Sequence, residues 1–312
     1  MSLDSRHPYA GDMTAPREQA ALVALLKGRP QGMSWPEIMA EVVEAGSAVE
    51  VWERVTVPTL LDLTEESELD LASADISRWH DEGLAFLTVL DEGYPARLRG
   101  IHQAPPVLFG RGRLIVDEPA VSVVGSRDAS ERGISIARAV AEALVKEGVT
   151  VVSGLAVGID SAAHRAALDA RGRTVGVIGT GIHRVYPAAS KALHEEISER
   201  GLLLSQFWPD APPQKHTFLM RNATMSGYGL ATVVVEAGEQ SGARAQARMA
   251  VEHGRPVILT DLVLQRNQWA QALLGRPGVH QASAISDVVD IIRGLTRDRD
   301  LISEALRQLV SA

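Results

Sequence analysis

Hydrophobic positions between residues 121 and 281 form short continuous runs, separated by longer stretches in which apolar residues recur at helical spacing. The continuous runs predict strands at 121–124, 150–152, 174–178, 202–204, 231–235 and 256–259, with a weaker one at 279–281. The stretches between them predict helices at 133–146, 158–171, 189–200, 219–226, 242–252 and 266–274. Strands that are apolar throughout are typical of a parallel sheet covered by helices on both faces. The alternation therefore predicts an α/β fold with a doubly wound, mostly parallel sheet.

The pattern before residue 84 predicts helices without intervening strands. The expected pieces are a flexible arm over residues 1–15, helices at 18–27, 35–45 and 73–82, and shorter pieces at 49–54 and 58–63. Ser73 is the expected N-cap of the last helix. We therefore expect a small all-helical domain over residues 1–83.

The rest of the chain is assigned to one core domain, residues 84–295, followed by a short C-terminal helix within 296–312. The core is expected to begin with a strand at 83–90 and an extended connector that includes Val107-Leu-Phe-Gly110.

Composition excludes several chemistries. The chain has no cysteine, which excludes disulfides, thiolate catalysis and cysteine-ligated zinc. No apolar run approaches the roughly 18 residues of a membrane span, and the first residues lack the apolar centre of a signal peptide. We therefore expect a cytoplasmic protein without a membrane partner.

The net charge of −8 is unevenly distributed. Residues 1–120 hold 10 Lys/Arg and 20 Asp/Glu, whereas residues 121–290 hold 17 and 16. The acidic residues of the helical part are most simply a solvated face. The core is close to neutral, so it carries no strongly basic nucleic-acid footprint.

The first predicted strand of the core leads into a glycine turn and then a helix. Gly125, Ser126 and Arg127 form the turn, and Ser130 and Gly133 precede the periodic helical stretch. This order points backbone N–H groups and the positive end of a helix at the same place, where a phosphate can bind. A tight turn without a ligand is the alternative interpretation.

Small and polar residues also follow the other predicted strands, and these strand ends share one edge of the sheet. We expect a ligand cleft along this edge, because turn geometry alone does not explain so many glycine-bearing loops. The candidate binding residues in these loops are Ser153, Gly154, Gly179, Gly181, Arg221, Asn222, Ser241 and Gly242.

Some of the candidate residues have two interpretations. Asp160 and His164 lie four positions apart on one predicted helix, so they could form a structural hydrogen-bonded pair or an acid–base pair. Glu236 could accept a hydrogen bond from a ribose or a base, or could bind N–H groups of the loops. Arg127 and Arg221 are the best anion contacts, because a guanidinium donates in a fork to phosphate. The sequence contains no recognisable catalytic triad or metal-ligand cluster.

Taken together, these loops resemble the DNA-processing protein A family, DprA/Smf. The matching runs are Gly125-Ser-Arg127 with Ser130 and Gly133, Ser153-Gly-Leu-Ala with Gly158-Ile-Asp160 and His164, Gly172 to Gly181 with Tyr186-Pro187, Arg221-Asn222 with Ser226-Gly227, and Val235-Glu-Ala with Ser241-Gly242-Ala243. Upstream, Tyr94-Pro95, Leu98, Pro105-Pro106 and Leu108-Phe109 with Gly112 also fit the family.

The resemblance implies an extended Rossmann-like fold that binds single-stranded DNA, forms a homodimer and hands DNA to a RecA-type recombinase in natural transformation, without enzymatic turnover and without a cofactor. It also implies that Gly125, Ser126, Arg127, Arg221 and Asn222 line a pocket for DNA phosphate. The chain departs from the family pattern at Ala223, where a second basic residue is usual, and at Gln206, where the family has glutamate. Only one short helix is predicted where many members carry a winged-helix domain. The alternative function is a nucleotide-binding sensor of the same superfamily, with a role in defence against foreign DNA.

Overall fold

The structure, a computed structural model, describes residues 15–56 and 67–310. It divides into two compact units, residues 1–94 and 95–312. The boundary expected from the sequence, after residue 83, precedes the end of the first unit at residue 94. The first unit extends further because it includes β1 (Ala85–Thr88), which packs with α1 and α4. The piece expected at 58–63, and the expected N-terminal arm as far as residue 14, lie outside the described residues.

The first unit is organised around α1 (Ala15–Gly28), in which every residue from Ala20 to Leu26 is buried. It contacts the other α-helices described in this unit, which are α2 (Trp35–Ala45), α3 (Ala48–Val55) and α4 (Glu68–Asp81). A 3-10 helix, Pro30–Gly32, lies between α1 and α2. The helices predicted from the sequence in this part are therefore confirmed where the structure describes them.

The start of α4 corrects one prediction. The helix begins at Glu68, and its N-cap is Ser67 rather than Ser73. Ser67 Oγ accepts a hydrogen bond from the Asp70 N–H at 3.2 Å, while the Asp70 carboxylate accepts from the Ser67 N–H at 3.3 Å. This reciprocal capping box stabilises the earlier start. Ser73 instead lies inside the helix, where its hydroxyl donates to the carbonyl oxygen of Leu69.

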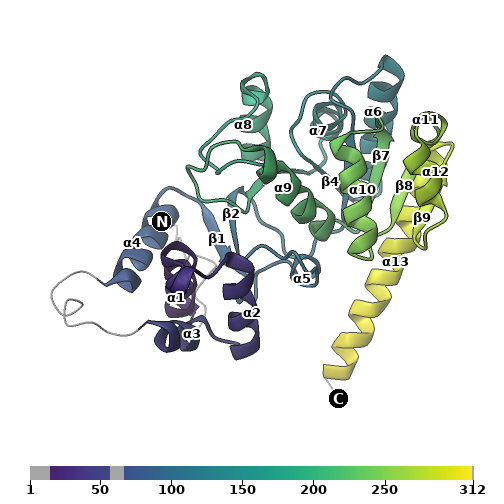
Figure 1. Cartoon of the computed structure of the whole chain (residues 1–312). Helices are drawn as coiled ribbons and strands as arrows, with labels where there is room; N and C mark the ends of the chain where they lie inside the picture. The colour runs from purple at the N-terminus through teal and green to yellow at the C-terminus, as the bar shows by residue number, and fades with distance from the viewer. Residues whose placement is uncertain (1–14, 57–66, 311–312) are drawn as a thin grey trace, which may run out of the picture. The chain divides into compact units, whose positions relative to one another are not determined.

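The second unit contains a sheet in which the strands lie in the order β2-β6-β5-β4-β3-β7-β8-β9. Figure 1 labels β2, β4, β7, β8 and β9 among them. The strands are β2 (Val107–Gly112), β3 (Ala120–Gly125), β4 (Thr150–Ser153), β5 (Thr174–Val177), β6 (Leu202–Ser205), β7 (Ala231–Glu236), β8 (Val257–Thr260) and β9 (Val279–Ala282). Neighbouring strands from β6 to β9 are parallel, and β2 is antiparallel to β6. The predicted mostly parallel, Rossmann-like sheet is confirmed.

Strand β2 is a finding that the sequence pattern did not predict, because its residues were interpreted as a connector. It pairs with β6 so that Phe109 lies opposite Ser205. Its apolar run, Val107 to Phe109, is short and follows two prolines. Such a run cannot be distinguished from an extended loop by periodicity, and only the partner strand decides.

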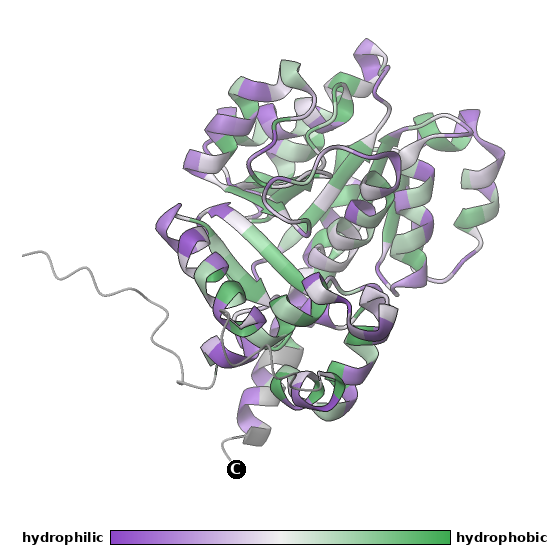
Figure 2. Ribbon diagram, turned by 60° about the vertical axis from the view of Figure 1, so that its left-hand side comes forward, coloured by the Kyte–Doolittle hydropathy of each residue, from purple (hydrophilic) through white to green (hydrophobic). Residues whose placement is uncertain are grey.

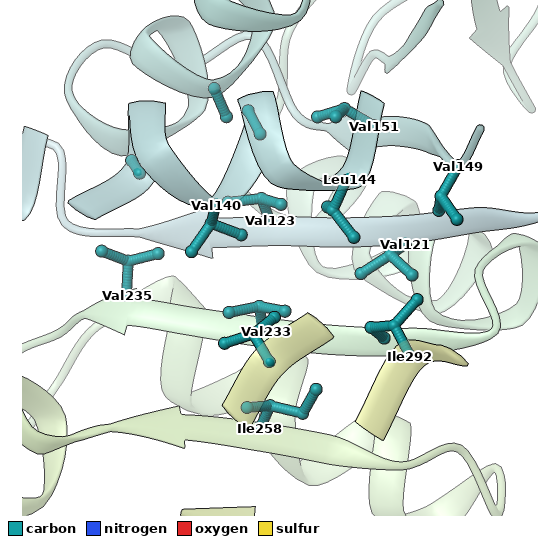
Figure 3. Packing of buried hydrophobic residues seen from close by; sticks show 14 of the residues in the cluster. Val121, Val123, Val140, Leu144, Val149, Val151, Val233, Val235, Ile258 and Ile292 are labelled. Atoms are coloured by element: carbon teal, nitrogen blue, oxygen red, sulfur yellow. The ribbon is translucent and has the colours of Figure 1, made fainter. Parts of the chain in front are cut away.

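Helices cover both faces of the sheet. On one face α6 (Glu131–Lys146), α7 (Ile159–Asp169) and α13 (Ile285–Val310) enclose a buried aliphatic cluster with β3, β4, β7 and β8 (Figure 3). On the other face lie α9 (Lys215–Tyr228) and α10 (Gly242–Glu252). Strand residues alternate between the layers: Val121 and Val123 face the cluster, whereas Ser122 Oγ donates to the Met225 carbonyl in α9. The strands are accordingly the most uniformly hydrophobic elements (Figure 2).

The remaining helices are short. They are α5 (Ala96–Arg99), α8 (Lys191–Arg200), α11 (Asp261–Arg266) and α12 (Gln268–Leu274), with a 3-10 helix at Ala188–Ser190. The helix predicted at 266–274 corresponds to α12, which begins at Gln268, and α11 is a further helix before it. They are separated by Asn267, whose backbone is extended and whose amide donates to the carbonyl oxygens of Val263 and Ala237.

The last helix differs from the expected C-terminal segment. α13 is 26 residues long and begins at Ile285, so a segment starting at residue 296 begins inside it. Val288 and Ile292, in its first half, are buried in the aliphatic cluster. This part of α13 therefore belongs to the core of the second unit.

The direction of winding reverses at β3. The chain builds β4, β5 and β6 on one side of this strand, and then returns to build β7, β8 and β9 on the other. The carboxyl ends of β3 and β7 meet at Gly125 and Glu236, with a shift of register after Val124. In doubly wound sheets this switch point is where ligands bind. The candidate site is therefore the rim around the ends of β3 and β7.

Candidate functional site

The glycine turn after β3 is attached at both ends to a single residue of β7. The Ser126 N–H donates to the backbone oxygen of Glu236 at 2.7 Å. At the other end of the turn, the Ser130 N–H and Oγ donate to Glu236 Oε2 at 3.0 and 2.9 Å. Ser130 Oγ also accepts from the Gly133 N–H at 3.1 Å and so caps α6. The loop that carries Arg127 is thus held in one conformation by Glu236.

Glu236 occupies the place at which the sequence predicts a phosphate. Its side chain is 8% exposed, and its other carboxylate oxygen, Oε1, accepts from Arg266 Nη1 at 3.2 Å. Of the two interpretations of Glu236, binding to loop N–H groups is therefore the one that the contacts show. The positive end of α6 already has an anionic partner from within the chain.

Gly125 in this turn and Gly133 in the first turn of α6 are both required by close packing. A Cβ atom on Gly125 would lie 2.5 Å from Ile159 Cγ1, and one on Gly133 would lie 2.0 Å from Glu236 Oε2. Both distances are shorter than any tolerable contact, so a larger residue would displace α7 or the carboxylate. The absence of a side chain at these two glycines therefore makes room for Ile159 and the Glu236 carboxylate rather than for a ligand.

Arg127 is exposed at the tip of this loop. Its guanidinium carbon lies 6.0 Å from the centre of the Phe218 ring, within the range of a cation–π contact. The Phe218 ring in turn lies 5.4 Å from the ring of Tyr186, which is 44% exposed. No acidic side chain among the described residues forms an ion pair with Arg127. Neither ring is among the binding residues predicted from the sequence: Tyr186 appears only within a run that matches the family, and Phe218 gives no signal because it is an isolated aromatic residue.

Arg221 lies close to Arg127 but is buried, with 6% of its surface exposed. Its Nη1 donates to the carbonyl oxygens of Gly154 and Val177, both at 2.7 Å, and its Nε donates to Asn222 Oδ1 at 3.2 Å. Burial lowers the pKa of Arg221; the negative charge of Asp160 opposes this shift and the positive charge of Arg127 adds to it. The structure therefore brings the two arginines together as expected, but only Arg127 is exposed.

Asp160 and His164 do not hydrogen-bond to each other. Asp160 Oδ2 accepts from the Gly154 N–H at 3.1 Å, and burial raises the pKa of this carboxyl while Arg221 opposes the rise. His164 Nδ1 lies 2.6 Å from Thr174 Oγ1, and burial lowers the pKa of its imidazole to about 3. The expected pairing is wrong, because each side chain reaches a different strand end. Neither group is placed for proton exchange with a ligand.

The other predicted site residues hold the loops of the rim. Ser153 Oγ donates to the Val123 carbonyl at 2.6 Å, and Ser241 caps α10. The contacts of the rest are Gly179 O with Thr217 Oγ1 at 2.6 Å, Gly181 N with Ala211 O at 2.9 Å, and Gly242 O with Asn222 Nδ2 at 3.4 Å. Their binding role, and the cleft itself, stay predictions.

Neither a metal site nor a membrane span is found in the described part of the chain. No three His, Asp or Glu side chains of residues 15–56 and 67–310 are grouped so that they could hold a metal ion. No described helix is both long and apolar enough to cross a bilayer.

The fold and the site define a class of protein: a doubly wound, Rossmann-like α/β protein with a pinned glycine loop at its switch point and an exposed arginine beside two aromatic rings. The chain belongs to the DNA recombination-mediator protein A family, whose family model matches residues 85–295. The resemblance predicted from the loops is thereby confirmed.

Two relatives illustrate the match. The DNA processing protein DprA of Streptococcus pneumoniae is 42% identical over 172 residues, which cover 55% of this chain and 61% of that protein. Its X-ray structure superimposes with a TM-score of 0.67 at 30% identity, over 88% of this chain and 97% of that one. A Helicobacter pylori DNA processing protein A, described for its single-stranded DNA binding mode, shares the fold, with a TM-score of 0.61 at 24% identity over 68% of this chain and 96% of that one. The matches span 45% to 62% of the length of the first curated relatives.

Proposed function

We propose that this protein binds single-stranded DNA at the rim of its switch point. The observation that carries this function is the exposed guanidinium of Arg127 beside the rings of Phe218 and Tyr186. A charged donor next to aromatic faces suits a strand whose phosphates and unpaired bases are both accessible. A duplex hides its base faces in the stack and can use only the arginine. The family of the chain and the binding named for the Helicobacter pylori protein support the same ligand.

The same proposal includes the absence of turnover. The nearest approach to a triad in the described residues is a chain from Ser226 Oγ to His253 Nδ1 at 2.5 Å, and from His253 Nε2 to Gln103 Oε1 at 3.1 Å. Ser226 is 1% exposed, so a substrate cannot reach its hydroxyl. These two hydrogen bonds join α9 to α10 and to Gln103, which supports a structural role for Ser226 and His253.

The finer parts of the proposal follow the family. A homodimer would present two rims to one strand, and the bound DNA would be passed to a RecA-type recombinase. A strand-exchange assay with a purified recombinase tests this step separately from DNA binding, because a protein that binds DNA but does not stimulate exchange would fail only the second part.

Binding is tested by fluorescence anisotropy with labelled single-stranded and duplex oligonucleotides of the same sequence. We expect the Arg127→Ala variant to lose about 10- to 100-fold in affinity for the single strand, because one charge-assisted phosphate contact is lost. The dependence of log affinity on log salt should decrease by about 0.7. Phe218→Leu, which keeps an apolar side chain but removes the ring, should weaken single-strand binding and leave duplex binding unchanged.

The matched control is Arg248→Ala, which removes an exposed arginine on α10 that pairs with Glu252. Its affinity should equal that of the wild type. Wild-type affinity in the folded Arg127→Ala and Phe218→Leu variants would remove the rim as the DNA site.

A further inference from the structure

The switch point contains a buried negative charge that comes from the chain itself. Glu236 is the last residue of β7, and its side chain turns toward the first turn of α6. Its carboxylate accepts from Ser130 N–H and Ser130 Oγ on one side and from Arg266 on the other. These are the kinds of donor that bind a phosphate group at a helix N-terminus.

We propose that Glu236 is a specificity residue that fills this position and so makes the rim reject free nucleotides. A phosphate monoester that entered here would compete with Glu236 for the same N–H and hydroxyl donors, and it would meet a carboxylate at hydrogen-bond distance. Like charges at that distance repel strongly where water is excluded. This proposal deepens the proposed function and rests on it for the accepted ligand, which is a polynucleotide.

The packing shows that the Glu236 carboxylate is held in a fixed position by the residues around it. Glu236 Oε2 lies so close to Gly133 that no side chain is tolerated there. Ser130 Oγ donates to Glu236 and at the same time accepts from the Gly133 N–H, so the orientation of its proton is determined. The N–H groups of Ser130 and Gly133 at the start of α6 are thus already used, the first by Glu236 and the second by Ser130 Oγ. The Glu236 side chain is 8% exposed.

The consequence separates two kinds of ligand. A phosphodiester of a DNA strand needs only Arg127, whose exposed side chain lies at the tip of the loop held by Glu236, next to the Phe218 ring. A mononucleotide gains little binding free energy from one arginine and depends on a binding site for its terminal phosphate. Because Glu236 occupies that site, a nucleotide sensor, the alternative function, would have no phosphate-binding site here.

The test removes the carboxylate and asks whether phosphate takes its place. The probes are inorganic phosphate and dAMP, with binding measured by calorimetry and by thermal unfolding. Glu236→Ala vacates the position, and we expect dAMP to bind it at least about tenfold more tightly than the wild type. Phosphate should raise the melting temperature of this variant and leave that of the wild type unchanged. Glu236→Gln keeps the space filled and should show no gain.

The control is Glu131→Gln, which removes a negative charge from the exposed first turn of α6 without touching the switch point. It should behave as the wild type. Because Glu236→Ala leaves the partly buried N–H of Ser130 without its partner, Glu236→Ser serves as a second variant. A rise in melting temperature with phosphate can be measured in either variant even if its stability is low.

The proposal is overturned if neither vacated variant responds to phosphate or dAMP, or if the wild type binds dAMP as tightly as they do. Oligonucleotide binding by the wild type is measured on the same samples. Its loss would contradict the proposed function, whereas an absent phosphate response alone would contradict only the role of Glu236.

Discussion

Arg127 and Arg221 show how surroundings divide two like residues between binding and structure. Their charges interact, yet Arg127 is exposed and Arg221 is buried with its Nη1 on two carbonyl oxygens. The N–H donors of an exposed guanidinium remain available to a ligand, whereas most of those of a buried one are hydrogen-bonded to the protein. Of the two arginines, Arg127 is therefore the one whose donors are accessible to a ligand.

His164 gives the structure a pH dependence. The pKa of its imidazole is lowered to about 3, mainly by burial and also by the positive charges of Arg221 and His194, while a hydrogen bond to the Ser153 backbone opposes this shift. The unfolded chain, with a pKa near 6.5, binds the proton more readily. The free energy of unfolding should therefore fall as the pH decreases below about 6.5, and continue to fall toward pH 3.

The contribution of His164 is isolated by comparing the wild type with His164→Gln, which does not titrate. Between pH 7 and pH 5, urea denaturation should show the wild type losing about 2 kcal/mol more than the variant. Parallel pH profiles for the two proteins would mean that His164 has the same pKa in the folded and the unfolded state.

At the scale of elements, one side chain of α9 joins the carboxyl ends of two strands. Arg221 bonds to Val177, the last residue of β5, and to Gly154, directly after β4. A Cβ atom on Gly154 would lie 1.9 Å from Arg221 Nη1, so the loop and the guanidinium fit closely. Asp160, at the start of α7, adds an opposite charge nearby.

Removing this connection should cost stability. For Arg221→Ala we expect a loss of about 2–4 kcal/mol in the free energy of unfolding, because buried carbonyls and the buried Asp160 lose their partner. The measurement is urea denaturation. Arg127→Ala is the matched comparison and should unfold with the wild-type midpoint. A fully stable Arg221→Ala protein would show that the rim holds its shape without this residue.

The elements themselves were largely predictable, and the reason is physical. Strands β3 to β8 are covered on both faces, so their apolar runs stand out against helices with one apolar stripe. The edge strand β9, with two exposed polar residues, gave only the weak signal noted for 279–281. Strand β2 was missed because its run is short and lies at the antiparallel side of β6. The N-cap of α4 was misplaced because two serines compete, and only Ser67 is followed three residues later by an acidic partner.

The location of the site, at the carboxyl ends of the parallel strands, was predictable from the sequence, but the contacts between its side chains were not. Chain order puts the loops after parallel strands on one edge, which brought Arg127 and Arg221 together correctly. Spacing along a helix permitted Asp160 and His164 to pair, but the strand ends offered each a better partner. The contact between Arg127 and Phe218 joins residues far apart in sequence, so no local pattern could contain it.

At the scale of the whole molecule, the start of the C-terminal helix completes the core of the second unit. Ile292 on α13 is 1% exposed within the same cluster as Val121 and Val233 (Figure 3). Ile292→Ala should lower the free energy of unfolding by about 2–4 kcal/mol, because it leaves a cavity against the sheet.

Leu301→Ala on the same helix is the control, since Leu301 is 63% exposed. Its denaturation midpoint should stay within error of the wild type. Equal effects of the two substitutions would argue that α13 does not contribute to the core.

The reversal of winding at β3 also bears on how the molecule forms. Ser130 and Glu236 are 106 positions apart, and their contact requires that β7 return beside β3 after the intervening strands have been built. Closing so long a loop costs entropy before any contact repays it, and parallel sheets of this kind fold slowly. The rim therefore depends on the pairing of β3 with β7, two central strands that are far apart in sequence. During synthesis this pairing can form only after β7 has been made.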